Sequence, residues 1–312
     1  MYKFFFIALI ITSGFFFFEI SAANKAYITN QGDDTVSLIN LDKLEVEKKI
    51  KVGQKPLGIT ILKKKSIAVV GNIESQNLSI IDMKTNTVIR SITLDATPLG
   101  LTHNLDESEI YVTDWFNNEV IIISSSTLQI IEKIKVGQTP SGIVFNKKHS
   151  QIIVSNRDAD TIEIYSEKTR ELIKVLPVGK HPYGISTYGD YIYTANVYDD
   201  SISIVDINSW EKIDISVGHH PYNIIQEDHY LFVTNSLDDN ISVIDLNTLK
   251  EEQKIATGET PENLWVDQIN NKLIVTNWGS DSITIIDLKN FKDTREIKSG
   301  LQNRAFGDFI VN

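Results

Sequence analysis

Two His-Pro-Tyr tripeptides stand at matching positions of this sequence, and the next two matching positions carry a glutamate and an arginine. Imidazole, phenol and carboxyl groups that converge can bind a ligand, coordinate a metal or transfer protons near neutral pH. A histidine in a turn is also commonly only solvated or hydrogen-bonded, so no catalytic residue is predicted. The candidate ligand-binding residues are His181, Tyr183, His220, Tyr222, Glu262 and Arg304. Two of them, His181 and His220, are also the candidate metal ligands.

Aromatic residues from a second kind of turn extend this set. Trp115, Tyr198 and Trp278 each follow a recurrent Asn or Asp by one or two positions, and Phe116 and Arg157 lie in the same kind of turn. A concave rim with aromatic walls and few polar groups is the usual form of a small-molecule site. We therefore expect these residues and the six above to surround one ligand site.

The chain is an array of seven repeats. Each copy begins with a four-residue motif such as Tyr-Ile-Thr-Asn at positions 27–30. The last residue of the motif forms the Asn column: Asn30, Asn72, Asp114, Asn156, Asn196, Asn235 and Asn277. Later in each copy comes the Gly column: Gly53, Asp95, Gly137, Gly179, Gly218, Gly258 and Gly300. Three residues further on is the Pro column: Pro56, Pro98, Pro140, Pro182, Pro221, Pro261 and Asn303.

Short β-branched segments, for example residues 36–39 and 241–244, lie between the columns. A repeat of about 40 residues with four short antiparallel strands is typical of a propeller blade. The sequence therefore predicts an all-β fold, a seven-bladed β-propeller of four-stranded antiparallel blades. Residues 305–311 are expected to form an extra inner strand that joins the N-terminal blade and closes the ring.

The columns have architectural explanations. Asn and Asp can bond their own backbone, Gly permits a positive φ, and Pro fixes φ where a strand begins. An apolar residue three positions after each Pro-column residue is expected to fill the space between blades: Ile59, Leu101, Ile143, Ile185, Ile224, Leu264 and Phe306. Trp265 in an inner strand is expected to compensate in size for Gly307 in the neighbouring blade.

Turns of an antiparallel meander alternate between its two ends. The loops that carry the Pro column and the turns after the Asn column should therefore share one face, which we call the Pro-turn face. The candidate residues lie on it, whereas changes in repeat length fall on the opposite face. Replacing Tyr183 and Tyr222 by Ala is expected to abolish binding with little change in melting temperature.

The repeat resembles the YVTN family of β-propeller repeats over residues 26–312. The resemblance rests on the Tyr-Val-Thr-Asn motif, a short Asp-rich turn, Val-Ser-Val-Ile-Asp and Val-Gly-x-x-Pro-x-Gly. It implies a propeller without implying one activity, because this family and its wider relatives include exported scaffolds, archaeal surface proteins, nucleic-acid binders, sugar lactonases and haem- or quinone-linked redox propellers. Fold does not decide among them.

Three functions remain open, and the sequence identifies no cofactor. The favoured one is an exported, non-catalytic binding or scaffold module that presents its Pro-turn face to a protein or a small ligand. The second is an accessory of periplasmic redox or of alcohol and amine catabolism, which co-purifying haem or quinone would support. The third is a lactonase-like or metal-dependent hydrolase, which requires His181, His220 and Glu262 to converge.

Composition restricts the partners. The 312 residues contain 30 Lys+Arg and 41 Asp+Glu, a net charge of −11, and no Cys, which excludes disulfides and thiolate sites. An acidic balance argues against nucleic acid as a partner, since Lys55, Arg157, Lys180 and Arg304 make only a sparse basic patch.

Residues 1–23 are typical of a secretory signal peptide, with Lys3, an apolar run over 4–18 and small residues before the cleavage site. The apolar run is shorter than the ~20 residues of a spanning helix. We expect residues 24–312 to form one propeller domain that is monomeric, has no transmembrane anchor and is periplasmic or secreted.

Overall fold

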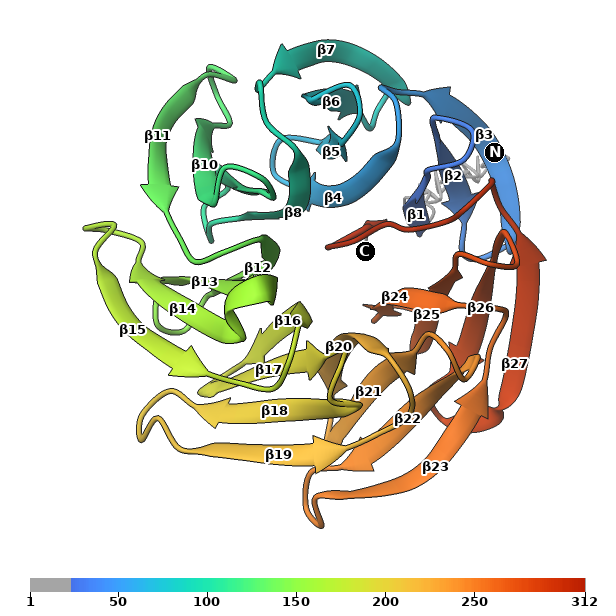
Figure 1. The fold of residues 1–312 in the computed structure, drawn as a ribbon. Helices are drawn as coiled ribbons and strands as arrows, with labels where there is room; N and C mark the ends of the chain where they lie inside the picture. Colours follow the sequence, from blue (N-terminus) through green and yellow to red (C-terminus); the bar gives the residue numbers. More distant parts are fainter. Residues whose placement is uncertain (1–23, 312) are drawn as a thin grey trace, which may run out of the picture.

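The computed structural model describes residues 24–311, so the predicted signal peptide at 1–23 lies outside the described residues. Seven four-stranded antiparallel sheets stand around a central axis (Figure 1). This arrangement confirms the predicted seven-bladed β-propeller. Within residues 24–311 there is no helix with the length and apolar character needed to cross a membrane.

Each blade runs from an inner strand at the axis to an outer strand at the edge of the ring (Figure 1). In that order the strands are, for blade 1, β28 (Ile310–Val311), β1 (Lys25–Asn30), β2 (Thr35–Asn40) and β3 (Glu45–Lys51); for blade 2, β4 (Pro56–Leu62), β5 (Ile67–Asn72), β6 (Asn77–Asp82) and β7 (Thr87–Thr93); for blade 3, β8 (Pro98–His103), β9 (Glu109–Asp114), β10 (Glu119–Ser124) and β11 (Ile130–Lys135); for blade 4, β12 (Pro140–Asn146), β13 (Gln151–Asn156), β14 (Thr161–Ser166) and β15 (Leu172–Pro177); for blade 5, β16 (Pro182–Tyr188), β17 (Tyr191–Asn196), β18 (Ser201–Asp206) and β19 (Lys212–Ser216); for blade 6, β20 (Pro221–Glu227), β21 (Tyr230–Asn235), β22 (Asn240–Asp245) and β23 (Lys250–Ala256); and for blade 7, β24 (Pro261–Asp267), β25 (Lys272–Asn277), β26 (Ser282–Asp287) and β27 (Asn290–Lys298). A single turn of 3-10 helix, η1 (Arg157–Ala159), follows β13.

The two ends of the described chain meet in blade 1, as the repeat order predicts. β28 pairs with β1 through Ala26 opposite Ile310, and the Tyr27 N–H donates to the Phe309 carbonyl at 2.9 Å. The closing strand is shorter than expected, because only Ile310–Val311 belongs to the sheet. Phe306 instead bridges to Gly58 of blade 2.

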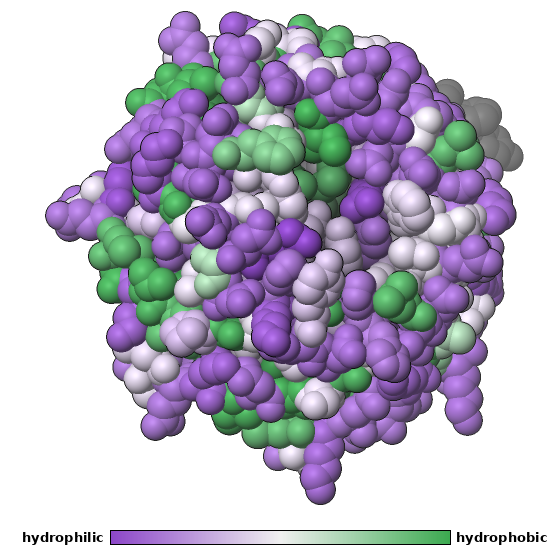
Figure 2. Space-filling view, viewed as in Figure 1, coloured by the Kyte–Doolittle hydropathy of each residue, from purple (hydrophilic) through white to green (hydrophobic). Residues whose placement is uncertain are grey.

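Hydrophobic cores lie between neighbouring blades. Val69 and Leu78 of blade 2, for example, pack in one cluster with Val112 and Ile121 of blade 3. Outer strands are mostly exposed, and Figure 2 shows a largely hydrophilic face with hydrophobic patches toward the edge of the ring. Burial of apolar area between blades is therefore what holds the ring together.

The Gly column has a different cause from the one expected. Within residues 24–311 the glycines with positive φ are Gly189 and Gly307, and neither belongs to this column. A Cβ on Gly53 would lie 2.6 Å from Cγ of Asn72, whose amide donates to Ser79 Oγ at 3.0 Å. Glycine is therefore required by the close approach of the Asn-column side chain in the next blade, so the explanation from positive φ is wrong.

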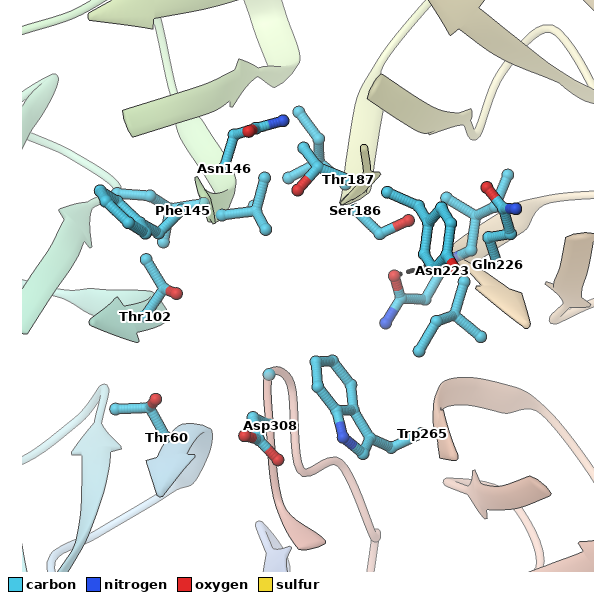
Figure 3. Close-up of a pocket in the computed structure, with 18 of the residues that line it drawn as sticks. Thr60, Thr102, Phe145, Asn146, Ser186, Thr187, Asn223, Gln226, Trp265 and Asp308 are labelled. Carbon is cyan, nitrogen blue, oxygen red and sulfur yellow. Dashed lines mark hydrogen bonds between the residues drawn. The ribbon is translucent and has the colours of Figure 1, made fainter. Parts of the chain in front are cut away.

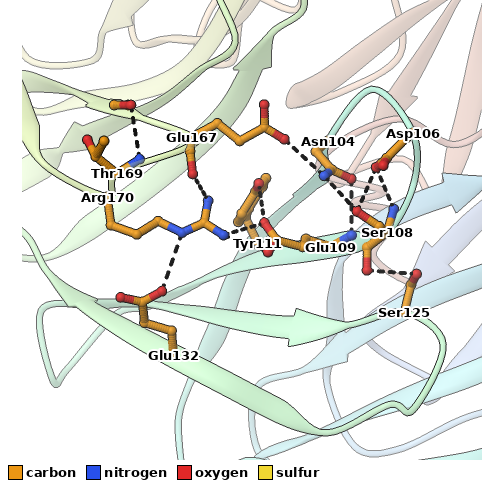
Figure 4. Close-up of polar contacts among 11 residues, drawn as sticks. Asn104, Asp106, Ser108, Glu109, Tyr111, Ser125, Glu132, Glu167, Thr169 and Arg170 are labelled. Carbon is orange, nitrogen blue, oxygen red and sulfur yellow. Dashed lines mark hydrogen bonds and ion pairs between the residues drawn. The ribbon is translucent and has the colours of Figure 1, made fainter.

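An ion-pair cluster fastens blade 3 to blade 4 on the face opposite the Pro-turns (Figure 4). Nη2 of Arg170 donates to both carboxylate oxygens of Glu109, at 2.6 and 2.7 Å, and Nε donates to Glu132 at 3.3 Å. The Tyr111 hydroxyl also donates to Glu109, at 2.7 Å. Because the Arg170 and Glu109 side chains are each 18% exposed, this pair is screened less than a surface pair.

Candidate functional site

The loops that carry the Pro column and the turns after the Asn column lie on one face, as predicted. The two histidines are fixed there by the preceding blade. His181 and His220 have left-handed backbones, with φ of 51° and 52°. Their N–H groups donate at 2.9 Å to Oδ1 of Asp160 and of Asp200, respectively. At four other connections between blades, an Asp or Asn four residues after the Asn column likewise accepts a bond from the N–H of the residue before the Pro-column position. This recurrent Asp or Asn was not identified from the sequence.

A layer of side chains closes the central channel, and we call it the central plug. It consists of Leu57, Leu99, Tyr183, Tyr222, Glu262, Arg304 and Phe306. The Tyr183 ring centre lies 4.3 Å from that of Tyr222 and 5.1 Å from that of Phe306. Phe306 therefore packs in the channel and does not fill the space between blades, which corrects the expectation for that residue. Six of its members directly follow a Pro-column position, and the seventh, Phe306, comes from the terminal segment.

Tyr183 is only 5% exposed. Its removal would leave a cavity in the plug, and cavities in packed interiors are costly. The expectation that Tyr183 and Tyr222 could be replaced with little change in melting temperature therefore conflicts with the packing around Tyr183.

A buried ion pair belongs to the plug. Nη1 of Arg304 lies 2.9 Å from Oε2 of Glu262 and donates to the Tyr222 hydroxyl at 3.2 Å. Burial raises the pKa of Glu262 to about 7, against the opposing effect of the Arg304 guanidinium. Glu262 can therefore change its charge near neutral pH.

Glu262→Gln is expected to alter how stability depends on pH. Because the pKa of Glu262 is raised on folding, its contribution is full below its usual value of 4.5 and is lost as pH rises through about 7. The wild type should lose unfolding free energy relative to the variant between pH 5 and 8, on the order of 2 to 3 kcal/mol. Urea unfolding of both proteins across this range measures the difference, and parallel pH profiles would contradict the titration of Glu262.

A cavity of about 720 Å³ lies above the plug on the Pro-turn face. Its wall includes a stack in which the Tyr198 ring centre lies 4.0 Å from His181 and 5.4 Å from His220. The Arg157 guanidinium lies 5.6 Å from the ring centre of Trp115 and 5.9 Å from that of Tyr198. Nη1 of Arg157 also donates to Oδ1 of Asp158 at 2.7 Å, so an adjacent carboxylate partly balances the charge of this guanidinium. The guanidinium and the two rings give the wall flat surfaces for a ligand.

Most of the predicted site residues meet at this cavity. It is lined by Trp115, Tyr183, Tyr198, His220, Tyr222 and Arg304. The other three are adjacent: His181 stacks on Tyr198, Glu262 pairs with Arg304, and the Trp278 ring centre lies 5.7 Å from Cζ of Arg304. Sequence reasoning missed the contributions of blades 1 and 2, namely Gln31, Ile73, Glu74 and Gln76. Gln31 and Ile73 occupy the same repeat position as Trp115, and Glu74 that of Tyr198, so comparison of the columns could have found them.

The convergence that a metal-dependent hydrolase requires is absent from residues 24–311. His181 and His220 both pack against the Tyr198 ring, whereas Glu262 is bound to Arg304 in the plug. No group of three His, Asp or Glu residues in this part of the chain is arranged to hold a metal ion. His181 and His220 thus face a phenol ring and do not meet Glu262.

Several buried polar atoms of the candidate residues lack a hydrogen-bond partner among the described residues. They are Nδ1 of His181, Nε1 of Trp278 and Nε of Arg304. Buried polar groups are nearly always satisfied, so such atoms call for an explanation.

Comparisons with known proteins identify the class. A family model described as YNCE-like beta-propeller matches residues 221–306, and one described as Cytochrome D1 heme domain matches residues 63–189. No curated protein matches the chain significantly. The fold and these matches define the chain as a β-propeller protein.

Many solved structures share the fold, and three of them illustrate the likeness. A functionally unknown protein from Desulfotomaculum acetoxidans DSM 771 is 15% identical, with a TM-score of 0.78 over 93% of this chain and 98% of that one. Dihydro-heme d1 dehydrogenase NirN in complex with DHE is 15% identical, with a TM-score of 0.70 over 90% of this chain and 65% of that one. Kuenenia stuttgartiensis Hydrazine Synthase is 17% identical, with a TM-score of 0.70 over 80% of this chain and 89% of that one. At these identities the likeness concerns the fold alone.

Proposed function

We propose that this chain is an exported binding module that takes a planar, anionic small ligand in the cavity of the Pro-turn face. The observation that carries the proposal is the Arg157 guanidinium between Trp115 and Tyr198 at the cavity wall. Lys55 and Arg304 line the same cavity. Export is supported by the sequence features of residues 1–23.

The chemistry of the wall favours this ligand class. Aromatic faces stack on planar groups, and guanidinium and ammonium groups bind carboxylates or phosphates through charge-assisted hydrogen bonds. Three cations, Lys55, Arg157 and Arg304, and one carboxylate, Glu74, line the cavity. Arg304 is paired with Glu262 at 2.9 Å and Arg157 with Asp158 at 2.7 Å, so a ligand anion would share these guanidinium groups with the protein carboxylates. Binding without catalysis is proposed because the two histidines pack on Tyr198 and do not face a carboxylate.

The test uses 2-naphthoate and its neutral analogue 2-naphthamide in calorimetric titrations. The wild type should bind the carboxylate more tightly than the amide, and Arg157→Ala should weaken naphthoate binding roughly tenfold or more. Arg295→Ala is the matched control, since Arg295 is exposed on the outer strand β27. Equal binding of the two compounds, or an Arg157→Ala variant that binds naphthoate like the control, would refute the proposal.

Haem is a second candidate for the ligand, favoured by the match of residues 63–189 to the haem-domain model. The cavity offers what a haem needs: the imidazole of His220 for the iron, aromatic faces for the ring and cations for the propionates. Bound haem would supply electron-transfer chemistry, as in the redox accessory considered from the sequence. A Soret absorption band in the purified protein that is lost in His220→Ala would favour haem over other planar anions.

A further inference from the structure

A second cavity, of about 530 Å³, lies on the opposite side of the central plug. Phe306 of the plug forms part of its wall, and none of its lining residues lines the cavity of the Pro-turn face. It is lined by the inner strands, whose side chains Thr60, Thr102, Ser186 and Trp265 point into the space (Figure 3). The two cavities are therefore separate sites.

Trp265 and Gly307 both line this cavity. The Trp265 ring faces the cavity (Figure 3), and the residue is only partly buried. Gly307 has a φ of 129°, and a Cβ there would lie 2.2 Å from the Ile59 carbonyl oxygen. Trp265 also packs against the hydrophobic cluster of blades 7 and 1, and Gly307 is required by its own backbone and by its contact with Ile59.

Asp308 follows this glycine and extends its carboxylate into the cavity between Trp265 and Thr60 (Figure 3). Its carboxylate accepts one weak bond, from the Ile310 N–H at 3.3 Å. It forms no ion pair with any of residues 24–311. Asp308 is half-buried on the cavity wall, so its carboxylate is partly desolvated without a counter-ion, and a bound cation would offset that cost.

We propose that this second cavity binds a small organic ammonium ion, with the ammonium group between the Asp308 carboxylate and the face of Trp265. An indole face attracts cations, and a carboxylate gives the charge-assisted partner. Thr60, Thr102 and Ser186 line the same cavity, and Oγ of Ser186 has no hydrogen-bond partner among the described residues.

Other charged groups face the same space. Burial raises the pKa of Asp308, whereas Lys63, His103 and Lys147 act in the opposite direction. Glu227 also lines the cavity, and burial raises its pKa. Lys63 and Lys147 are exposed at the rim of the cavity, where they would repel a cation. The ligand must therefore be small, so that its cationic group can reach Asp308 without lying beside the two lysines. The ammonium ion needs the ionised Asp308, so affinity should fall as pH drops through its raised pKa.

The test compares choline with its neutral carbon isostere, 3,3-dimethylbutan-1-ol, by calorimetry. The wild type should bind choline and not the isostere, and Asp308→Asn should weaken choline binding roughly tenfold or more. Asp228→Asn, which removes an exposed carboxylate on the same face, should bind choline like the wild type. Trp265→Leu should weaken choline binding several-fold, because it removes the indole face while leaving the charge of the protein unchanged.

Asp308→Asn should fold, because the raised pKa means that the ionised carboxylate destabilises the ligand-free protein at neutral pH. A melting curve at or above that of the wild type checks this point. Equal affinity for choline and its isostere, unchanged choline binding in Asp308→Asn, or binding of inorganic phosphate through Lys63 and Lys147 in place of choline would each overturn the proposal. None of these outcomes concerns naphthoate binding on the other face, so the two proposals can fail separately.

Discussion

Deletion of residues 306–312 is expected to destabilise the protein strongly and to promote association between molecules. The deletion removes three buried apolar side chains, those of Phe306, Phe309 and Ile310. Burial of each contributes about 1.5–3 kcal/mol, and the net stability of a domain is only about 5–15 kcal/mol. The edge of β1 would also lose its partner β28, and unpaired edges favour association. Thermal unfolding by circular dichroism and sedimentation velocity measure the two effects.

Leu301→Ala is the control for this deletion, because Leu301 lies in the same terminal segment and is 49% exposed. It should melt close to the wild type. A truncated protein that stays monomeric and melts like Leu301→Ala would show that β28 does not hold the ring closed.

Tyr183→Ala is expected to lower the free energy of unfolding by about 3–5 kcal/mol, the usual cost of removing a large buried aromatic side chain. Tyr183 is the centre of the plug, in contact with both Tyr222 and Phe306. Its loss would also open the layer that separates the two cavities. Urea unfolding monitored by circular dichroism measures the change.

The matched control is Tyr198→Ala, since Tyr198 is 54% exposed and lies on the wall of the Pro-turn cavity. It should cost less than about 1 kcal/mol. If both variants lost the same small amount of stability, the channel would not be closed by a packed plug. Tyr198→Ala is also the better choice for testing ligand binding, because it leaves the plug intact.

The architecture could be predicted from the sequence because each repeat carries the same strand and turn signals. The spacing between the Asn and Pro columns placed both kinds of turn on one face, and the terminal segment was correctly assigned to blade 1. Local rules were less reliable where two blades meet. Gly53 is required by the amide of Asn72 in the next blade, a contact that no rule about single residues contains.

The candidate site could be predicted only in outline. The sequence predicted that the variable residues after the Pro column lie together on the Pro-turn face, but the burial of each depends on how seven side chains share the channel. Tyr183 and Phe306 therefore entered the plug, which was not foreseen. Asp308 was not predicted as a binding residue, because no motif in the terminal segment distinguishes it from the many other acidic residues of the chain.

The position of each tryptophan allows one measurement to test the central claim. The four tryptophans of the chain lie in distinct places: Trp115 on the Pro-turn cavity, Trp278 beside Arg304, Trp265 in the second cavity and Trp210 near Lys174. Fluorine NMR of 5-fluorotryptophan-labelled protein, assigned by single Trp→Phe variants, reports on all four at once. The account predicts that 2-naphthoate shifts the Trp115 resonance, leaves those of Trp265 and Trp210 unchanged, and has no such effect in Arg157→Ala. A titration that shifts Trp265 or Trp210 while Trp115 stays fixed would contradict a ligand site on the Pro-turn face.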